Sequence, residues 1–416
     1  MKHKIKIGKH TLRIDIGFIL ILLWMCALSC LALYTSFNLI SIGSGTRYLV
    51  MQVIWYIVGF TTMGIIGYFH NRVLYRYMRP AYNFLMGCLV YLFLSMVCSR
   101  LLHFNLPLAP TLNGAVSWFQ IPFISSFQPS EFLKIVLIVM TAQTITSFQK
   151  KHKNPTMHDD LHMLWEIGKV VLPPLVLIFL QPDTGVCIII FVTILVMLMC
   201  SGIRKQYIWI LLGLAVLAIG GFFYLYFFQE DFLHSFVSSY RLQRIDAWLD
   251  PESNIRGSSN QLYTALLSLG SSGLTGYGLQ PNIIAIPEAH TDFIFAAFGQ
   301  SFGLIGTTVI VLSCFGLDLY LCKIAYNMRN RTDRLIVIGV IGMLFYQQIQ
   351  NLGMIVGLLP ITGITLPLIS YGGSSILSYF IAFGFISNSS PQARKKGIRI
   401  GKLKKRTSAN KGSSNV

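Results

Sequence analysis

Long apolar blocks separated by short polar breaks dominate the pattern of the chain. Most blocks run for about 20 residues, the length that a helix needs to cross a hydrocarbon core of about 30 Å. Charged residues and Gly- or Pro-containing turns mark the breaks. The pattern predicts an all-α polytopic membrane protein with about ten transmembrane helices. The expected spans lie near residues 17–36, 50–68, 80–98, 131–148, 168–181, 185–201, 207–227, 292–322, 335–357 and 366–388.

Two of the breaks are long enough to hold structure of their own. They are residues 99–130, and a large outer loop at residues 228–291 between spans seven and eight. We treat residues 1–389 as one transmembrane domain. Residues 390–416 form a basic tail without apolar periodicity, which we expect to be disordered and held near anionic lipid of the inner leaflet.

The composition supports a membrane location. Only 12% of the 416 residues are charged and 54% are hydrophobic, whereas soluble domains carry about 25% charged residues. A cytosolic enzyme and a disordered chain are therefore excluded. The eight cysteines fall in or beside apolar blocks and show no spacing typical of a disulfide framework or a zinc site.

The net charge of +18 is concentrated at alternate ends of the apolar blocks. With the N-terminus in the cytoplasm, 27 of the 33 lysines and arginines lie in inner segments and five in outer segments. This bias follows the positive-inside rule and predicts that both termini are cytoplasmic. It also argues against nucleic acid as the partner of the basic residues.

Few ionisable residues lie within the apolar blocks, where each charge costs about 3 kcal/mol. Glu131 and Lys134 are three residues apart and share a helix face, so they form either an internal ion pair or part of a substrate site. Asp183 lies in a Pro/Gly turn, which favours a turn role. We expect Asp318 to reach Lys323 or solvent.

Three ionisable residues, Glu288, His290 and Asp292, cluster immediately before span eight at its outer boundary. His290 or Thr291 could cap that helix, with Asp292 in its first turn. Capping explains one acidic residue but not the whole cluster, which favours chemistry on an amphiphilic substrate.

The large outer loop also carries candidate binding residues. The Arg244 guanidinium suits phosphate oxygens. Trp248 and Trp118 suit either the membrane interface or the face of a sugar, and the interface is the favoured interpretation.

Several segments together resemble the SEDS family (shape, elongation, division and sporulation), and their order and spacing match across most of the chain. The matching segments are Asn113-Gly114-Ala115 with Trp118, Gln128-Pro129-Ser130-Glu131-Phe132 with Lys134, Gln181-Pro182-Asp183-Thr184-Gly185, Arg244-Ile245 before Asp250-Pro251, Pro287-Glu288 with His290-Thr291-Asp292-Phe293, Asn351 with Gly353-Met354, Gly357-Leu358-Leu359-Pro360-Ile361-Thr362-Gly363, and Leu366-Pro367 with Ser370-Tyr371-Gly372-Gly373-Ser374-Ser375.

The resemblance implies a peptidoglycan glycosyltransferase that polymerises lipid II at the outer face of the bacterial cytoplasmic membrane. It implies that Asp292 is catalytic, that a divalent cation (Mg or Mn) stimulates the enzyme, and that a class B penicillin-binding protein is the partner. The Leu358–Gly363 segment and the short tail favour the RodA branch, with a role in cell-wall elongation and cell shape. Division and sporulation relatives share most of the motifs.

The chemistry agrees with a single catalytic carboxylate. A sugar hydroxyl needs a base, whereas a diphosphate leaving group needs charge neutralisation rather than a proton. We assign Asp292 as the base, with Arg244, Lys134 or a divalent cation facing the diphosphate. Glu131 and Glu288 would hold that cation or orient the other groups. The predicted substrate-binding residues are Arg244, Lys134, Glu131, Glu288, His290, Gln261 and Trp118.

The chain also departs from the family pattern. Gln261 alone keeps the register of the usual large-loop motif, and Gln300 and Ser301 stand where the family commonly has two glutamates. This leaves two alternatives open, a catalytically weak scaffold for a penicillin-binding protein and a flippase of a lipid-linked precursor. The glutamines of span nine would then line a transport path, or else serve as hydrogen-bonding groups between helices.

Overall fold

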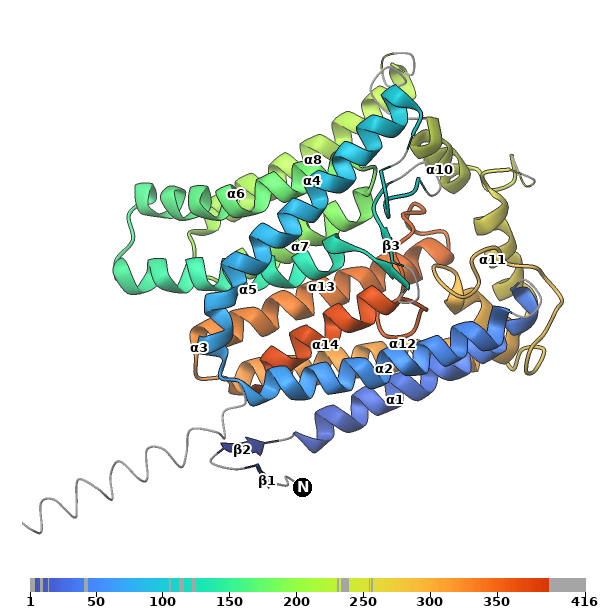
Figure 1. The fold of residues 1–416 in the computed structure, drawn as a ribbon. Coiled ribbons are helices and arrows are strands. Elements are labelled where there is room, and N and C mark those ends of the chain that lie inside the picture. The colour runs from blue at the N-terminus through green and yellow to red at the C-terminus, as the bar shows by residue number, and fades with distance from the viewer. Residues whose placement is uncertain are drawn as a thin grey trace, which may run out of the picture.

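The computed structural model shows a bundle of long helices that run side by side (Figure 1). It describes residues 4–7, 10–13, 15–40, 44–104, 106–111, 116–121, 125–229, 232, 239–253, 255 and 257–388. The Asn113-Gly114-Ala115 segment and the basic tail from residue 390 lie outside the described residues.

The helices and strands have the following bounds. The long helices are α1 (Ile16–Thr35), α2 (Ser44–Tyr68), α4 (Met78–Leu102), α5 (Pro129–Lys151), α6 (Met157–Leu180), α7 (Thr184–Met199), α8 (Lys205–Phe228), α12 (Ile294–Asn327), α13 (Arg331–Ile355) and α14 (Gly373–Asn388). Shorter helices are η1 (Phe37–Leu39), α3 (Asn71–Leu74), η2 (Tyr75–Tyr77), α10 (Ser239–Leu249) and α11 (Asn260–Ser271). Two hairpins pair β1 (Lys4–Ile7) with β2 (His10–Arg13) and β3 (Phe119–Ile121) with β4 (Ser125–Phe127).

Each of the ten expected spans is a helix in the structure. Within the described residues, eight helices are long and apolar enough to cross a membrane. The other two expected spans, α7 and α14, have 16 residues each. The all-α membrane fold predicted from the sequence is therefore confirmed.

Two of the predicted boundaries are wrong. Helix α6 begins at Met157, eleven residues before the expected start, because Thr156 and Asp159 form a capping box ahead of the apolar run. Helix α14 begins at Gly373, not at residue 366, because residues 367–369 form a turn in which Leu368 has a φ of 62°. The hydroxyl of Tyr56 on α2 donates a hydrogen bond to the Leu368 carbonyl and holds this turn against the bundle.

The helices differ in how deeply they pack. In α5 and in α13, 67% of the residues in the most apolar 18-residue stretch are buried. In the corresponding stretch of α8, none is buried. Helices α5 and α13 therefore form the centre of the bundle, and α8 presents apolar side chains to its surroundings. Figure 1 shows α14 between α13 and α2.

The outer loops contain the local structure expected of them. The β3–β4 hairpin lies within residues 99–130, with Phe119 paired to Phe127, and α10 and α11 lie within residues 228–291. In Figure 1 the β3–β4 hairpin, α10 and α11 gather at one end of the bundle, and the N-terminal β1–β2 hairpin lies at the opposite end.

Helix α12 is interrupted at Gly303, whose φ of 60° and ψ of −152° are not helical. The residues from Ile294 to Ser301, before the break, are all buried. Residues 304–327 alone would extend about 36 Å, enough to cross a hydrocarbon core. The segment before the break is therefore not needed for crossing.

A second segment, residues 273–278, crosses α12 at this break and satisfies the backbone groups that the break leaves free. Its four hydrogen bonds are Tyr277 N to Gln300 O (2.9 Å), Gly278 N to Ser301 O (3.0 Å), Leu304 N to Gly273 O (3.0 Å) and Ile305 N to Leu274 O (3.1 Å). A Cβ atom at Gly303 would lie 2.5 Å from the Leu274 backbone, and one at Gly276 would lie 2.4 Å from the Ser301 backbone. Only glycine allows this close crossing.

Candidate active site

The segment that carries Asp292 is a tight turn immediately before α12. Glu288 has a φ of 53°, and its carbonyl accepts hydrogen bonds from the backbone N–H groups of Thr291 (3.1 Å) and Phe293 (3.2 Å). The Thr291 hydroxyl donates to Glu288 Oε2 at 3.0 Å. The expected capping role is wrong, because Phe293 is the N-cap residue and no side chain caps the helix. The hydroxyl of Thr291 is used within the turn instead.

Three consecutive carbonyl groups of this segment are held by residues from much later in the chain. The bonds run from Tyr371 N to His290 O (2.9 Å), from Ser370 Oγ to Thr291 O (2.7 Å) and from Asn351 Nδ2 to Asp292 O (2.8 Å). Asn351 Nδ2 also donates to Ile364 O at 2.7 Å. The position of Asp292 is therefore fixed by α13 and by the loop between α13 and α14.

Arg244 on α10 and Asp292 meet at Gly363 in that loop. A Cβ atom at Gly363 would lie 3.4 Å from Asp292 Oδ2 and 3.4 Å from Arg244 Nη1. Arg244 Nη1 also donates to the Ile361 carbonyl at 3.5 Å. The fold thus brings together a carboxylate and a guanidinium that are distant in sequence, which are two of the predicted site residues.

The surroundings of Asp292 favour a base that works near neutral pH. Burial raises the pKa of Asp292 to about 6, because the ionised carboxylate loses solvation. The Arg244 guanidinium lowers this pKa, and the Glu288 carboxylate raises it. Asp292 nevertheless keeps part of its surface exposed. An exposed face and a raised pKa are both suited to accepting a proton from a substrate.

His290 lies within an aromatic cluster. Its ring stacks on Tyr48 of α2, with ring centroids 4.4 Å apart, and lies 6.1 Å from the ring of Tyr371. Burial lowers the pKa of His290, against the opposing effect of Glu288, so the imidazole is neutral at pH 7. His290 therefore offers an aromatic face and a neutral ring at the site, rather than a positive charge.

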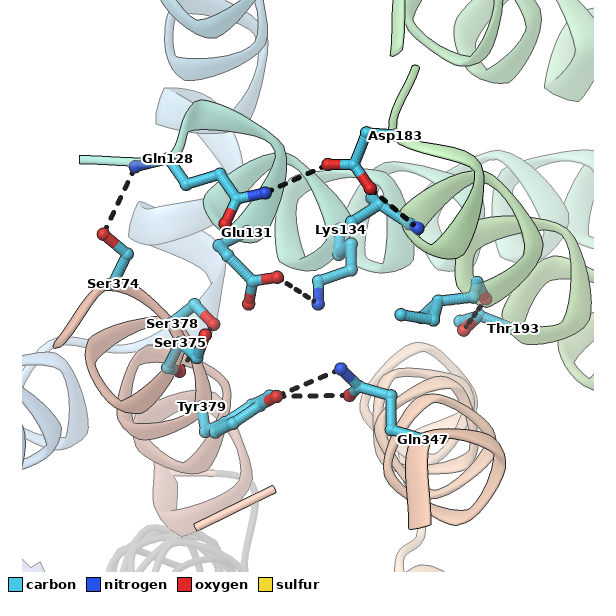
Figure 2. Close-up of polar contacts among 12 residues, drawn as sticks. Gln128, Glu131, Lys134, Asp183, Thr193, Gln347, Ser374, Ser375, Ser378 and Tyr379 are labelled. Atoms are coloured by element: carbon cyan, nitrogen blue, oxygen red, sulfur yellow. Dashed lines mark hydrogen bonds and ion pairs between the residues drawn. The ribbon is translucent and has the colours of Figure 1, made fainter. Parts of the chain in front are cut away.

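A second polar cluster lies at the N-terminal end of α5 (Figure 2). Lys134 Nζ and Glu131 Oε1 are 2.8 Å apart, and both side chains are buried. Gln128 Nε2 donates to Asp183 Oδ2 at 3.0 Å, and Trp118 Nε1 donates to Gln128 Oε1 at 3.2 Å. The internal ion pair is thus the arrangement that the structure contains.

Asp183 in this cluster is the N-cap residue of α7. Its Oδ1 accepts a hydrogen bond from Val186 N at 3.3 Å, in agreement with the turn role favoured from the sequence. Helix α7 then packs on the loop that borders Asp292. A Cβ atom at Gly185 would lie 3.0 Å from Ile364 Cγ1 and 3.4 Å from Thr362 O. The two polar clusters therefore adjoin the same loop.

The contacts of the other predicted site residues are with groups other than the Asp292 side chain. The charged groups that act on the Asp292 carboxylate are Arg244 and Glu288, and Lys134 is not among them. Gln261 is the second residue of α11 and is partly exposed. Trp118 and Trp248 are half-buried, and the Trp248 indole donates to Gly357 O at 3.0 Å. Both tryptophans thus hold outer loops in place.

The expectation for Asp318 is wrong. The residue is 5% exposed, and its Oδ1 accepts a hydrogen bond from Gln348 Nε2 at 3.5 Å. Lys323 instead lies over the ring of Tyr320. Asp318 lies on the buried face of α12, together with Leu317 and Leu321, and this face packs against α13.

Gln300 and Ser301, at the two positions where glutamates were expected, both donate hydrogen bonds, whereas Gln300 Oε1 is buried and has no hydrogen-bond partner among the described residues. Gln300 Nε2 donates to Ser268 Oγ (3.1 Å) and to Ile284 O (2.9 Å), and Ser301 Oγ donates to Ala297 O (3.3 Å). The α13 glutamines behave in the same way. Gln347 bonds Tyr379, Gln348 bonds Asp318 and Gln350 bonds the Pro360 carbonyl. These contacts fit hydrogen bonding between segments rather than a transport path.

Several residues of the site had no assigned role in the sequence. Asn351, Gly363 and Ser370 lie in segments that resemble the family, and an Asn or Gly in an apolar region is a signal for a special backbone contact. Tyr48 belongs to none of those segments. Only the folded chain places the beginning of α2 beside His290.

The described residues contain no group of three or more His, Cys, Asp or Glu that could hold a metal ion. Asp292 and Glu288 are the two carboxylates near the site. Magnesium commonly binds through one or two carboxylates together with substrate phosphates. This pair therefore fits a cation that arrives with a phosphorylated substrate, and does not fit a cation held by protein alone.

Comparison with known proteins gives a consistent result. The family model FTSW_RODA_SPOVE, described as "Cell cycle protein", matches residues 15–395. A probable peptidoglycan glycosyltransferase FtsW of Geobacter sulfurreducens is 30% identical over 400 residues, which cover 93% of this chain and 99% of that protein. Stage V sporulation protein E of Bacillus subtilis is 33% identical and covers 68% of this chain and 73% of its own. Peptidoglycan glycosyltransferase MrdB of Escherichia coli is 31% identical, with coverage of 66% and 70%.

Solved structures share the fold. A chain from a study of a peptidoglycan synthase complex superposes with a TM-score of 0.69 at 23% identity, covering 90% of this chain and 96% of that chain. The rod shape determining protein RodA of Thermus thermophilus superposes with a TM-score of 0.61 at 22% identity, covering 90% of this chain and 95% of that chain.

Proposed function

Because this chain belongs to the FtsW/RodA/SpoVE (SEDS) family, we propose that it is a peptidoglycan glycosyltransferase that polymerises lipid II at the outer face of the cytoplasmic membrane. The observation that carries the proposal is the meeting of the Asp292 carboxylate and the Arg244 guanidinium at Gly363. A base and a phosphate-binding group side by side are the two functions that the reaction needs.

The reaction follows from these two groups. The hydroxyl oxygen of the acceptor sugar attacks the anomeric carbon of the donor, and Asp292 takes the hydroxyl proton. The bond between the anomeric carbon and the diphosphate oxygen breaks, and the diphosphate leaves with the electron pair. Arg244 neutralises the charge that develops on that leaving group. A single displacement of this kind inverts the anomeric configuration.

A divalent cation fits this scheme as a second source of positive charge. Asp292 and Glu288 are the residues that would hold Mg²⁺ or Mn²⁺, together with the diphosphate oxygens. When bound, such a cation would neutralise the diphosphate.

The buried pair Glu131–Lys134 acts on the site indirectly, through the residues and helices that it contacts. The pair lies on α5 beside Gln128, and Gln128 binds the N-cap residue of α7. Helix α7 in turn contacts the loop that borders Asp292. We assign Glu131 and Lys134 a positioning role, in place of the direct diphosphate contact expected for Lys134.

The proposed partner is a class B penicillin-binding protein, which would crosslink the strands that this chain makes. A fold neighbour comes from a study of a peptidoglycan synthase complex, and this supports the proposal. The elongation role favoured by the Leu358–Gly363 segment stays a prediction, since the relatives carry the names FtsW and stage V sporulation protein E as well as RodA.

The test is polymerisation of purified lipid II by this protein together with its penicillin-binding partner, in Mg²⁺ or Mn²⁺. We expect glycan polymer from the native protein and none from Asp292→Asn, which removes the base and keeps the side-chain shape. Glu252→Gln is the matched control, because Glu252 is an exposed acidic residue of the same outer loop. It should polymerise at the native rate.

The other outcomes are equally informative. Polymer from both the native protein and Asp292→Asn would remove Asp292 from the mechanism. If the native protein makes no polymer in an intact complex, the polymerase proposal is wrong. The scaffold is then the favoured alternative, since Gln300 and Ser301 are the sites where the chain departs from its family.

A further inference from the structure

The loop between α13 and α14 contains two glycines with almost the same backbone φ angle. Gly357 has a φ of 77° and Gly363 a φ of 74°, both in the left-handed region that disfavours residues with a Cβ atom. Replacement by alanine would strain the backbone at either position. Alanine variants at the two positions can therefore be compared with each other, because a side chain meets a similar φ at both.

The space around the two glycines differs. At Gly357 the nearest atoms to an added Cβ are Leu266 methyl groups at 3.8 Å, an ordinary contact distance. At Gly363 the nearest atoms are Asp292 Oδ2 and Arg244 Nη1, both at 3.4 Å, followed by Arg244 Nη2 at 3.7 Å. A methyl group at Gly363 would thus touch both charged groups of the site at once.

We propose that Gly363 is a positioning residue for the reaction, because its missing side chain keeps the space shared by Asp292 and Arg244 open to the substrate. The occupants of that space are the reacting sugar hydroxyl, beside the carboxylate, and the diphosphate, beside the guanidinium. This inference rests on the proposed glycosyltransferase function. It adds a backbone position to a site otherwise defined by side chains.

The geometry argues against two simpler roles for this glycine. Conformational freedom alone would make Gly357 and Gly363 equivalent, and their surroundings differ as described. Close packing against another helix would place backbone or apolar atoms next to the Cβ position, as Leu274 lies next to Gly303. At Gly363 the neighbouring atoms are the two functional groups themselves.

The test compares Gly363→Ala with Gly357→Ala in the polymerisation assay, using the complex with the penicillin-binding partner and purified lipid II. We expect Gly363→Ala to lower kcat/KM by at least about tenfold, since small displacements of reacting groups are costly. Gly357→Ala should stay within about twofold of the native protein, because this position shares the positive φ but an added methyl group there touches no functional group.

The kinetic constants separate occupation of the site from a general loss of structure. A methyl group in the space that the substrate occupies should raise KM as well as lower kcat in Gly363→Ala, and should change neither by more than about twofold in Gly357→Ala. A structural defect that lowers the fraction of folded protein would lower the apparent kcat and leave KM unchanged.

Several results would overturn the inference. One is native activity in Gly363→Ala, and another is an equal loss of activity in the two variants with no change in KM. If Gly363→Ala does not fold, Gly363→Asn and Gly357→Asn repeat the comparison, because Asn adopts positive φ more readily. If neither Gly363→Ala nor Gly363→Asn folds while Gly357→Ala and Gly357→Asn do, Gly363 is needed for folding and the inference is overturned. If the native protein makes no polymer, the proposed function itself fails.

Discussion

The sequence identifies Asp292 as the candidate base but does not identify the cationic group that lies beside it. The cluster of Glu288, His290 and Asp292 indicates chemistry at the outer boundary. Ionisable side chains beside a membrane span carry a free-energy cost, so a cluster of three suggests a functional role. Sequence alone leaves Arg244, Lys134 and a cation as equal candidates for the diphosphate. The choice depends on contacts between residues far apart in the chain, and the structure places Arg244 at the carboxylate and pairs Lys134 with Glu131.

The raised pKa of Asp292 leads to a prediction about pH. Asp292 acts as a base only when it is deprotonated, so polymerisation should fall as the pH drops through about 6. Arg244→Gln removes a charge that lowers this pKa and should move the acidic limb to higher pH. Glu288→Gln removes a charge that raises it and should move the limb to lower pH. Rates measured between pH 4.5 and 8 with both variants check the two signs.

Movement of the limb in the same direction in both variants would contradict this account. So would a limb that stays in place in Asp292→Glu and in both charge variants, because the titrating group would then lie elsewhere.

The buried pair Glu131–Lys134 leads to a prediction about stability. Glu131→Gln would leave the Lys134 ammonium, whose side chain is 2% exposed, without its counter-charge. Loss of one partner of a buried pair costs about 3–5 kcal/mol, whereas replacing both partners is often neutral. We expect Glu131→Gln to lower the thermal midpoint in detergent strongly, and Glu131→Gln with Lys134→Met to recover most of it. A double variant less stable than the single variant would refute this.

At the scale of elements, apolar length predicts that a helix exists better than it predicts where the helix ends. All ten spans are present because a run of apolar residues in lipid must satisfy its own backbone. The early start of α6 comes from a capping box among polar residues, which apolar runs do not detect. The break in α12 at Gly303 was not predicted, because it depends on residues 273–278 crossing the helix. A lone glycine in an apolar run carries no such information.

The crossing at Gly303 predicts a large effect of one methyl group. Gly303→Ala would bring Cβ to 2.5 Å from the Leu274 backbone, and the segment could not keep its hydrogen bonds to α12. We expect a loss of at least about 3 kcal/mol in the free energy of unfolding, as for other severe overpacking. Gly316→Ala is the control on the same helix, since a Cβ atom there meets nothing within 4 Å. Thermal unfolding in detergent should show it unchanged or slightly more stable.

At the scale of the whole molecule, the distribution of basic residues and the arrangement of the loops are consistent with one orientation in the membrane. The β1–β2 hairpin lies at one end of the bundle, and β3–β4, α10 and α11 gather at the other (Figure 1). Basic residues predict that the first end is cytoplasmic. Sequence supports this orientation well because the rule depends only on composition near the spans. Helices α5 and α13 are less apolar than α8, but this difference does not by itself show that they form the centre, because a less apolar helix can pack inside the protein or border water.

The orientation has a direct test. In a variant without the native cysteines, Glu252→Cys and Asn154→Cys place a thiol at exposed positions near opposite ends of the bundle. A reagent that does not cross membranes should label Glu252→Cys in intact cells and Asn154→Cys only after lysis. Labelling of Asn154→Cys in intact cells would reverse the predicted orientation.

The three clamped carbonyls at His290, Thr291 and Asp292 have a consequence for biosynthesis. A ribosome makes the chain from the N-terminus, so Asp292 enters the membrane well before Asn351, Ser370 and Tyr371 exist. The side-chain amide of Gln52 on α2 donates a hydrogen bond to the Ser370 carbonyl at 3.0 Å, and this bond too can form only after Ser370 has been made. A nascent chain released early would therefore carry the base without the clamp that holds it. The donors Asn351, Ser370 and Tyr371 come from α13 and from the loop that follows it, so the three carbonyl groups gain their hydrogen-bond partners only after residue 371 has been made.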